Sequence, residues 1–263
     1  TDSFNTAVGF NAGVNVTTGT FNTLVGGLAG DGLTTGQQNV ALGYNALGAE
    51  DTGNKSVAVG ISALAAQNND DNNFNVAVGH QAGFSVTTGV QNTLIGGLAG
   101  TSLTTPNQNV AVGHGALDAE TTGARNTAIG TNALTSQNDT TGSNVYNVGL
   151  GYFAGANITT GIQNTLLGSL AGDSLQDADA NVAVGTSALG ADTLGSRSTA
   201  VGLGALEAQN FTTATFSLNV AVGYGAGGAV TTGRRNTLIG AQAGDVITDA
   251  DNNVAVGTDA LGT

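Results

Sequence analysis

The sequence of 263 residues contains no cysteine, methionine or tryptophan, and only one proline. Without cysteine the chain can form neither a disulfide, nor a thiolate nucleophile, nor a cysteine-based zinc site. The lack of cysteine and methionine also makes the chain hard to oxidise, which fits exposure outside a cell. No apolar run approaches the roughly 20 residues of a membrane-spanning helix, so we expect no membrane insertion.

Charge is scarce and one-sided. Eighteen acidic residues against five lysines and arginines give a net charge of −13. Binding of nucleic acid needs clusters of basic side chains to neutralise phosphates, so we expect no nucleic-acid partner. Aromatic residues make up only 5% of the chain, whereas hydrophobic residues reach 40%. We therefore expect a core packed from small aliphatic side chains.

Glycine, in contrast, is abundant, with 43 residues. One glycine, called the anchor here, recurs in motifs such as NTAVGFNAG (5–13) and NVAVGTDAL (253–261), and positions are counted from it. Successive anchors differ by 17 in residue number, except that every fourth step is 19 or 21, which gives a super-repeat with a length of 70 (79 − 9) or 72 (151 − 79). The anchors number fifteen: Gly9, Gly26, Gly43, Gly60, Gly79, Gly96, Gly113, Gly130, Gly151, Gly168, Gly185, Gly202, Gly223, Gly240 and Gly257.

The motif predicts strands rather than helices. A glycine inside every unit would cost a helix about 1 kcal/mol each, whereas short β-branched segments bounded by Gly and Asn are typical of strands. Each unit has room for two or three short strands. We therefore predict an all-β fold, a parallel β-solenoid (β-roll or β-helix) of about fifteen 17-residue coils. It would form a single repeat domain over 1–263, with super-repeats at approximately 1–70, 71–142, 143–214 and 215–263.

Two neighbouring positions of the predicted strand are apolar in every unit. Position −1 is always Val, Leu or Ile, and position −2 is Ala, Leu or once Gly149. Because side chains alternate between faces along a strand, one column fills the coil and the other forms an apolar stripe outside it. Either the half-coil containing TTG folds over that stripe, or copies of the chain bury it. We favour self-association, with the −2 column, including Leu94 and Leu166, as the seam.

Asparagine occupies position −4 in thirteen units, with Ser56 and Ser198 as the exceptions. Stacked in a solenoid, each buried amide could donate to the coil on one side and accept from the coil on the other. We therefore predict a structural role for this column.

The repeated NTAVGxxA and NVAVGxxA units resemble the heads of trimeric autotransporter adhesins and the glycine-rich shafts of phage tail fibres. The resemblance implies left-handed parallel β-rolls that trimerise through an apolar inner strand, although the adhesin heads use shorter repeats. It implies a structural or adhesive fibre segment that is extracellular, on the cell surface or on a virion. The expected partners are the chain itself, as a homotrimer or an end-to-end filament, and a cell-surface glycan or receptor. The alternative is a carbohydrate-binding or depolymerase module of a tail fibre.

Catalytic chemistry is hard to find in the sequence. His80 and His114 stand two units apart, too far for a dyad, and no serine has a histidine base beside it. The sequence GGLAG lacks the Lys-Ser/Thr of a phosphate loop. We therefore expect no catalytic residues, no enzymatic activity and no bound cofactor other than, as a candidate, calcium.

The calcium prediction rests on two acidic segments. Closely spaced carboxylates beside amides and turn carbonyls are what a hard Ca²⁺ ion requires, although a merely solvated acidic turn is the simpler explanation. The candidate ligands are Asp173, Asp177, Asp179, Asp245, Asp249 and Asp251.

Two further columns carry polar side chains. Lys55, Arg125 and Arg197 occupy position −5 of successive fourth units, and Arg235 holds it in a second unit. This spacing predicts salt bridges to loop acids or to another chain. A column of Thr at position +8 would suit ice binding, but Asp and Asn residues interrupt it.

The ends of the chain resemble interior units. The sequence begins with TDSF, which matches the tail of a fourth-unit loop, and stops after a third unit. Solenoids normally carry atypical terminal repeats. We therefore expect a processed or excerpted stretch of a longer fibre protein, or a subunit that stacks end to end.

Overall fold

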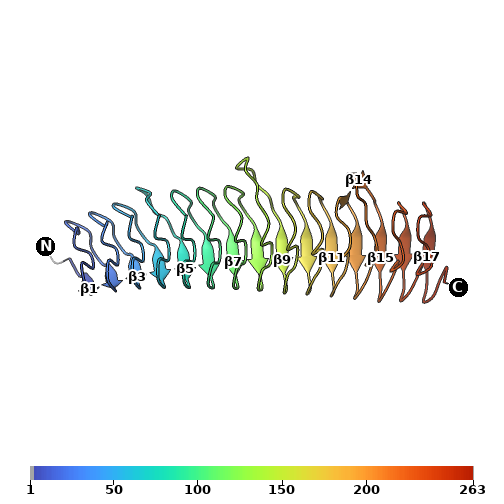
Figure 1. Cartoon of the computed structure of the whole chain (residues 1–263), viewed down its shortest axis with the longest axis horizontal. Coiled ribbons are helices and arrows are strands. Elements are labelled where there is room, and N and C mark those ends of the chain that lie inside the picture. Colours follow the sequence, from blue (N-terminus) through green and yellow to red (C-terminus); the bar gives the residue numbers. More distant parts are fainter. Residues whose placement is uncertain (1–2, 263) are drawn as a thin grey trace. The chain divides into compact units, whose positions relative to one another are not determined.

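The protein, described by a computed structural model over residues 3–262, is an all-β parallel β-solenoid with no helix among those residues. It packs as two compact units. The first runs to Asn126 and includes Asp139–Asn144, and the second comprises Thr127–Asn138 and the chain from Val145 onward. Figure 1 shows the strands of each unit side by side, with the longer loops beyond the N-terminal ends of the strands; this is called the loop side of the coil.

The first unit contains one three-residue strand per coil: β1 (Thr6–Val8), β2 (Thr23–Val25), β3 (Val40–Leu42), β4 (Val57–Val59), β5 (Val76–Val78), β6 (Thr93–Ile95) and β7 (Val110–Val112). The second unit follows the same plan with β8 (Thr127–Ile129), β9 (Val148–Leu150), β10 (Thr165–Leu167), β11 (Val182–Val184), β13 (Thr199–Val201), β15 (Val220–Val222), β16 (Thr237–Ile239) and β17 (Val254–Val256). The about fifteen coils predicted from the anchor glycines are thus confirmed. That the whole chain behaves as one domain stays a prediction.

Pairing within each unit is parallel and in register. Ala41 lies opposite Ala58, one ordinary step along the chain, and Ala58 lies opposite Ala77 across a longer step. In the second unit Ala128 pairs with Gly149 across the longest kind of step. The extra residues of each fourth coil therefore bulge outward as loops and leave the strand register unchanged.

The loop side of the coil contains little sheet, which differs from the prediction of two or three strands per coil. Its regular pairing is confined, among the described residues, to β12 (Gly195–Ser196) with β14 (Thr215–Phe216), and to the isolated bridges Asn54–Asn72 and Ala124–Asn144. Elsewhere glycine-rich turns follow one another, and backbone N–H groups donate to carbonyls one coil away, as from Thr34 to Asp51.

The −2 column fills the inside of the coil, so our assignment of it as an intersubunit seam was wrong. Leu94, Leu166 and the alanines stacked with them are buried within the chain itself. The half-coil with TTG encloses this column rather than the other one. Position −1 is the column that faces outward.

Packing inside the coil accounts for the four-coil super-repeat. In a second coil Leu24 and Leu33 fill the interior, and a Cβ on Gly30 would come within 2.8 Å of Leu24 and 2.9 Å of Leu33. In third and fourth coils position −2 is alanine, and a leucine at +4, such as Leu47 or Leu64, occupies that space. Each coil therefore places its large side chains where its neighbours leave room.

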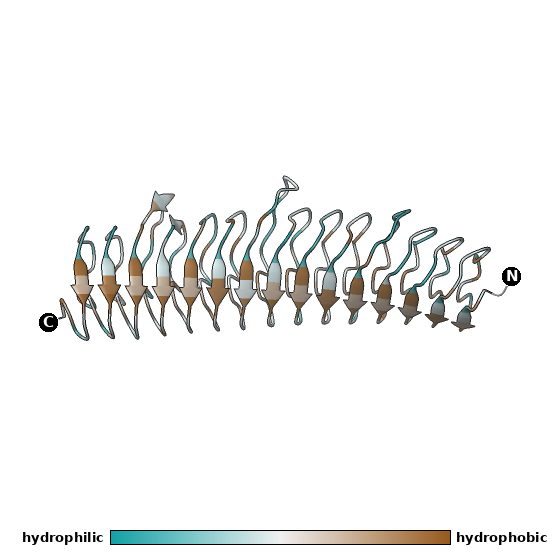
Figure 2. Ribbon diagram, turned by 180° about the vertical axis from the view of Figure 1, so that it is seen from behind, coloured by the Kyte–Doolittle hydropathy of each residue, from teal (hydrophilic) through white to brown (hydrophobic). Residues whose placement is uncertain are grey.

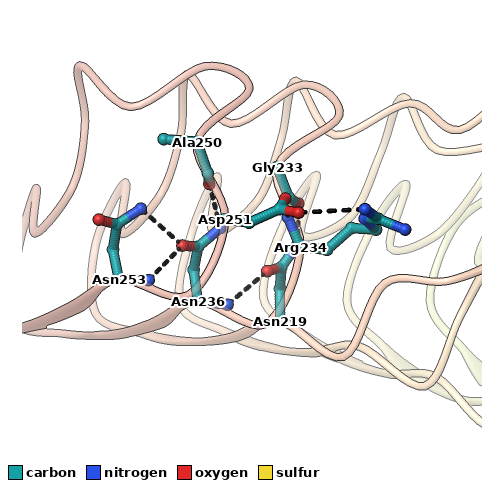
Figure 3. A network of polar contacts seen from close by, with 7 residues as sticks. All are labelled: Asn219, Gly233, Arg234, Asn236, Ala250, Asp251 and Asn253. Carbon is teal, nitrogen blue, oxygen red and sulfur yellow. Dashed lines mark hydrogen bonds and ion pairs between the residues drawn. The ribbon is translucent and has the colours of Figure 1, made fainter.

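The asparagine column is structural, as predicted. The predicted pattern, donation to one neighbouring coil and acceptance from the other, occurs at Asn92 and Asn164, but in most of the column both amide atoms bond to the following coil. Asn22 Oδ1 accepts from the backbone N–H of Asn39 at 2.9 Å, and Asn22 Nδ2 donates to the carbonyl of Gly36 at 2.8 Å. Both partners belong to the following coil. Figure 3 shows the same arrangement in the second unit, where Asn236 Nδ2 donates to the Ala250 carbonyl and Asn236 Oδ1 accepts from Asn253.

The outer face of the sheet is apolar. Position −1 is aliphatic in every coil and position −3 is Thr or Val, and both are half-buried to exposed: Ile95 and Leu167 are 39% exposed and Leu150 is 42% exposed. Figure 2 shows hydrophobic colour on many strands of both units and hydrophilic colour in many of the loops. No charged residue occurs at either position.

Candidate functional site

A row of side chains projects from the loop side at position −5, the column that carries the cations. Its residues have left-handed backbone, with φ of +58° at Gln38, +63° at Lys55 and +64° at Arg125. Non-glycine residues adopt this conformation only when the surrounding structure demands it. In most of the row the N–H donates to a carbonyl of the preceding coil, as from Lys55 to Gln37 at 3.0 Å. The coil thereby fixes the direction in which these side chains project.

In the first unit part of this row forms a chain of hydrogen bonds. Arg125 Nε donates to Gln108 Oε1 at 3.0 Å, and Gln108 Nε2 donates to Gln91 Oε1 at 3.1 Å. The three side chains come from three successive coils, and the bonds align them along the solenoid.

A cavity of about 350 Å³ opens beside these side chains, in the first unit. Its walls are amides, hydroxyls and one guanidinium, contributed by residues far apart in the sequence. The protruding loop of the second super-repeat supplies one edge. The lining residues are Gln91, Thr105, Pro106, Asn107, Gln108, Thr122, Ala124, Arg125, Gly142 and Asn144.

An equivalent cavity of about 250 Å³ lies in the first super-repeat. It has Lys55 where the other has Arg125, since both stand at position −5 of a fourth coil. Neither set of lining residues includes a carboxylate. The residues around this second cavity are Gln37, Gln38, Asn54, Lys55 and Asn72.

Two cations of this column, Lys55 and Arg197, stack on aromatic rings, which sequence reasoning did not anticipate. Lys55 Nζ lies 5.0 Å from the centre of the Phe74 ring, and the guanidinium of Arg197 lies 3.9 Å from that of Phe216. An ion pair of the kind we predicted is formed instead by Arg234 and Asp251, at 3.1 Å (Figure 3). Stacking leaves a cation available to a ligand, whereas an ion pair would occupy it.

Each super-repeat with a fourth coil also buries one carboxylate at position +7 of its third coil. These are Glu50, Glu120 and Asp192, all fully buried. Each accepts a hydrogen bond from the start of the following protruding loop, through the N–H groups of Asn69, Asp139 and Phe211. In the first and third super-repeats a glutamine of the fourth coil, Gln67 or Gln209, also donates to it. The carboxylates thus anchor the loops that edge the cavities.

Burial raises the pKa of Glu50, Glu120 and Asp192, and the hydrogen bonds to each carboxylate oppose that rise. A raised folded-state pKa means that the group's contribution to the free energy of unfolding falls as pH rises from the unfolded value, about 4, through the folded pKa. We therefore expect the melting temperature to decline over this window. The triple variant Glu50→Gln, Glu120→Gln and Asp192→Asn should lack that part of the decline. Scanning calorimetry from pH 4 to 7 compares the two slopes, and equal slopes would contradict the assignment.

Three of the predicted calcium ligands make hydrogen bonds within the coil stack. Asp179 Oδ1 accepts from the N–H of Ile162 at 2.8 Å, and Asp177 Oδ1 accepts from the Thr160 hydroxyl at 2.9 Å. Asp251 Oδ1 accepts from the N–H of Arg234, and hydrogen bonds from Arg234 lower the pKa of Asp251. Asp179 thus repeats the role of Asn107 in the second super-repeat, whose side chain accepts from Val90.

The other three candidate ligands lie elsewhere on the coil. Asp249 accepts from the Thr248 hydroxyl at 3.3 Å. Asp245 Oδ1 is buried and accepts no hydrogen bond, and burial raises the pKa of Asp173. Within residues 3–262 no group of three or more His, Asp or Glu side chains gathers in a way that could hold a metal ion. Calcium binding stays a prediction.

Asp173 lines a third cavity, of about 300 Å³, together with Glu207. Both stand at position +5, two coils apart, with Gly190 between them. Two coils correspond to about 9.6 Å of sheet. Sequence reasoning missed this pair because the two carboxylates belong to distant parts of the chain, and only the coil period relates them. Leu170, Ser174, Ser187, Gly190 and Ala191 complete the walls.

The remaining candidates contribute no site. His80 and His114 are both exposed and stand two coils apart. Among residues 3–262 the structure contains no helix with the length and hydropathy to cross a membrane.

No protein-family model matches the chain, and no curated protein is significantly similar to it.

Proposed function

We propose that the protein is a structural and adhesive fibre segment, extracellular or on a virion, that associates with copies of itself through the outer face of its sheet. The observation that carries the proposal is the uncharged face of aliphatic and Thr/Val side chains at positions −1 and −3. Exposed tyrosines at position +1, Tyr44, Tyr152 and Tyr224, extend it along one edge. Because the same apolar positions recur in every coil, a partner could cover this face along its whole length.

The size of the face supports a second copy as its occupant. In the first unit seven strands about 4.8 Å apart, each presenting about 10 Å, offer about 340 Å². The eight strands of the second unit offer about 380 Å². Each face by itself is as large as the largest apolar patch of a typical monomer, about 300–600 Å², and such patches often serve association. A standard interface buries about 800 Å² per partner.

Charge added to the outer face should separate the copies without unfolding them. Val78 and Val112 point outward from β5 and β7, so Val78→Asp with Val112→Asp would place carboxylates on the seam. We expect the unmodified chain to sediment as an oligomer and the variant as a monomer with nearly unchanged circular dichroism. Thr18→Asp with Thr88→Asp, two exposed turn positions, adds the same charge away from the sheet and should leave the oligomer intact. A folded monomer in the unmodified chain would refute self-association.

The cavity containing Asp173 and Glu207 favours a second candidate function, a polysaccharide depolymerase. Glycosidases use two carboxyl groups, one of them with a raised pKa, and inverting enzymes place the two about 6.5–9.5 Å apart. Burial raises the pKa of Asp173, which would suit it to the role of general acid. Release of reducing ends from a polysaccharide by the purified chain, abolished by Asp173→Asn and by Glu207→Gln, is the result that would favour this function over the first.

A further inference from the structure

We infer that the two cavities of the first unit, around Lys55 and around Arg125, are binding sites for a polysaccharide that carries carboxylate groups. The inference rests on the adhesive part of the proposed function and names its ligand. It would place the sites on the loop side of the coil, beyond the N-terminal ends of the strands that form the face proposed for self-association.

The cation content of the cavities points to an acidic ligand. The whole chain has five basic residues against 18 acidic ones, and yet each cavity contains one basic residue and no carboxylate among its lining residues. Stacking on Phe74 holds the Lys55 ammonium in place without neutralising it. Arg125 is positioned through its Nε hydrogen bond to Gln108, and a guanidinium can pair with a carboxylate through two parallel bonds.

The remaining walls suit a sugar. Amides both donate and accept, as do hydroxyls, and the same is true of the ring hydroxyls of a saccharide. Around Arg125 the lining includes four amide side chains and two threonines, at Gln91, Gln108, Asn107, Asn144, Thr105 and Thr122. No aromatic residue lines either cavity, so stacking of a sugar ring contributes nothing there and each single site should be weak.

Repetition compensates for weak single sites. Lys55 and Arg125 occupy the same position in successive super-repeats, so four coils separate them. Four coils correspond to about 19 Å, so both cavities can engage one polymer chain. The second binding event is then intramolecular, and it raises the apparent affinity well above that of either site.

The third super-repeat provides an internal contrast. Asp179 stands there where the first two have Gln37 and Asn107, and Ala180 stands where they have Gln38 and Gln108. A carboxylate beside Arg197 repels an acidic sugar, and the missing glutamine removes a donor. Arg197 should therefore contribute little to binding.

Surface plasmon resonance with the immobilised full chain tests the inference, with polygalacturonate as the acidic polymer and dextran as the neutral one. We expect binding of polygalacturonate that weakens with added salt, and at least tenfold weaker binding of dextran. Lys55→Gln with Arg125→Gln should lower polygalacturonate binding at least tenfold, with an unchanged melting temperature. Arg197→Gln is the matched control and should bind like the unmodified chain.

Three results would overturn the inference: equal binding of the two polymers, no binding of polygalacturonate, or unchanged binding in the double variant. The variant Val78→Asp with Val112→Asp distinguishes failure of polysaccharide binding from failure of self-association. It changes the outer face of the sheet and leaves both cavities intact. If it still binds polygalacturonate, the sites are independent of the seam. If the unmodified chain is a monomer that binds, only the self-association proposal fails.

Discussion

Replacing Gly26 by alanine is expected to lower the free energy of unfolding by about 4 kcal/mol. An alanine Cβ there would lie 2.5 Å from the carbonyl oxygen of Gly43 in the next coil, and Gly26 has a φ of +136°. Side chains in this backbone region cost about 1–3 kcal/mol, and a contact that must force backbones apart costs a similar amount. Denaturant unfolding followed by circular dichroism measures the loss.

The neighbouring glycine is the matched control. A Cβ on Gly27 would meet only the Tyr44 ring, at 3.5 Å, which is an ordinary contact. Gly27→Ala should therefore change the free energy of unfolding by less than about 1 kcal/mol. If both variants lose the same stability, the close stacking of anchor glycines is not what constrains the coil.

The second large effect distinguishes the two faces of one strand. Leu94 is fully buried, so Leu94→Asp removes a leucine from the core, at a cost of about 2–5 kcal/mol, and places a carboxylate where nothing neutralises it. We expect the first unit to lose its cooperative thermal transition. Ile95→Asp, one residue along β6 on the outer face, should keep that transition. Scanning calorimetry of both variants makes the comparison, and a folded Leu94→Asp protein that merely dissociates would restore the −2 column as the seam.

The sequence predicted the fold well because the features that define it are local and periodic. Each anchor glycine, with the aliphatic residue before it and the asparagine four before it, recurs at a fixed step, and stacking by that step places like residues on like. The choice between the −1 and −2 columns was beyond this reasoning. Both are apolar, and what decides between them is the volume left by the residues at +4 and +7, such as Gly30 and Leu33, in the same and adjacent coils.

The cavities were harder to predict for a different reason. They depend on the left-handed backbone at position −5, where residues as different as glutamine, lysine, arginine, phenylalanine, alanine and leucine stand in different coils, so that residue type does not reveal the positive φ. Their walls combine two or three coils with a protruding loop. The stacking of Lys55 on Phe74 joins one coil to the next across a fourth-coil loop, and it depends on the length of that loop. Only the regular placement of the cations was visible in the sequence.

The bonds of the asparagine column also give the solenoid a direction of assembly. Asn22, Asn39 and their equivalents bond through both amide atoms to the coil that comes after them, and only some also donate back, as Asn75 does to Gln67 and Asn92 to Asn75. Each coil is therefore completed mainly by its successor. During synthesis from the N-terminus, every newly emerged coil would satisfy the buried amide of the coil already formed. Folding can then advance along the nascent chain one coil at a time. At each step only the asparagine of the last folded coil lacks its hydrogen bonds to a following coil.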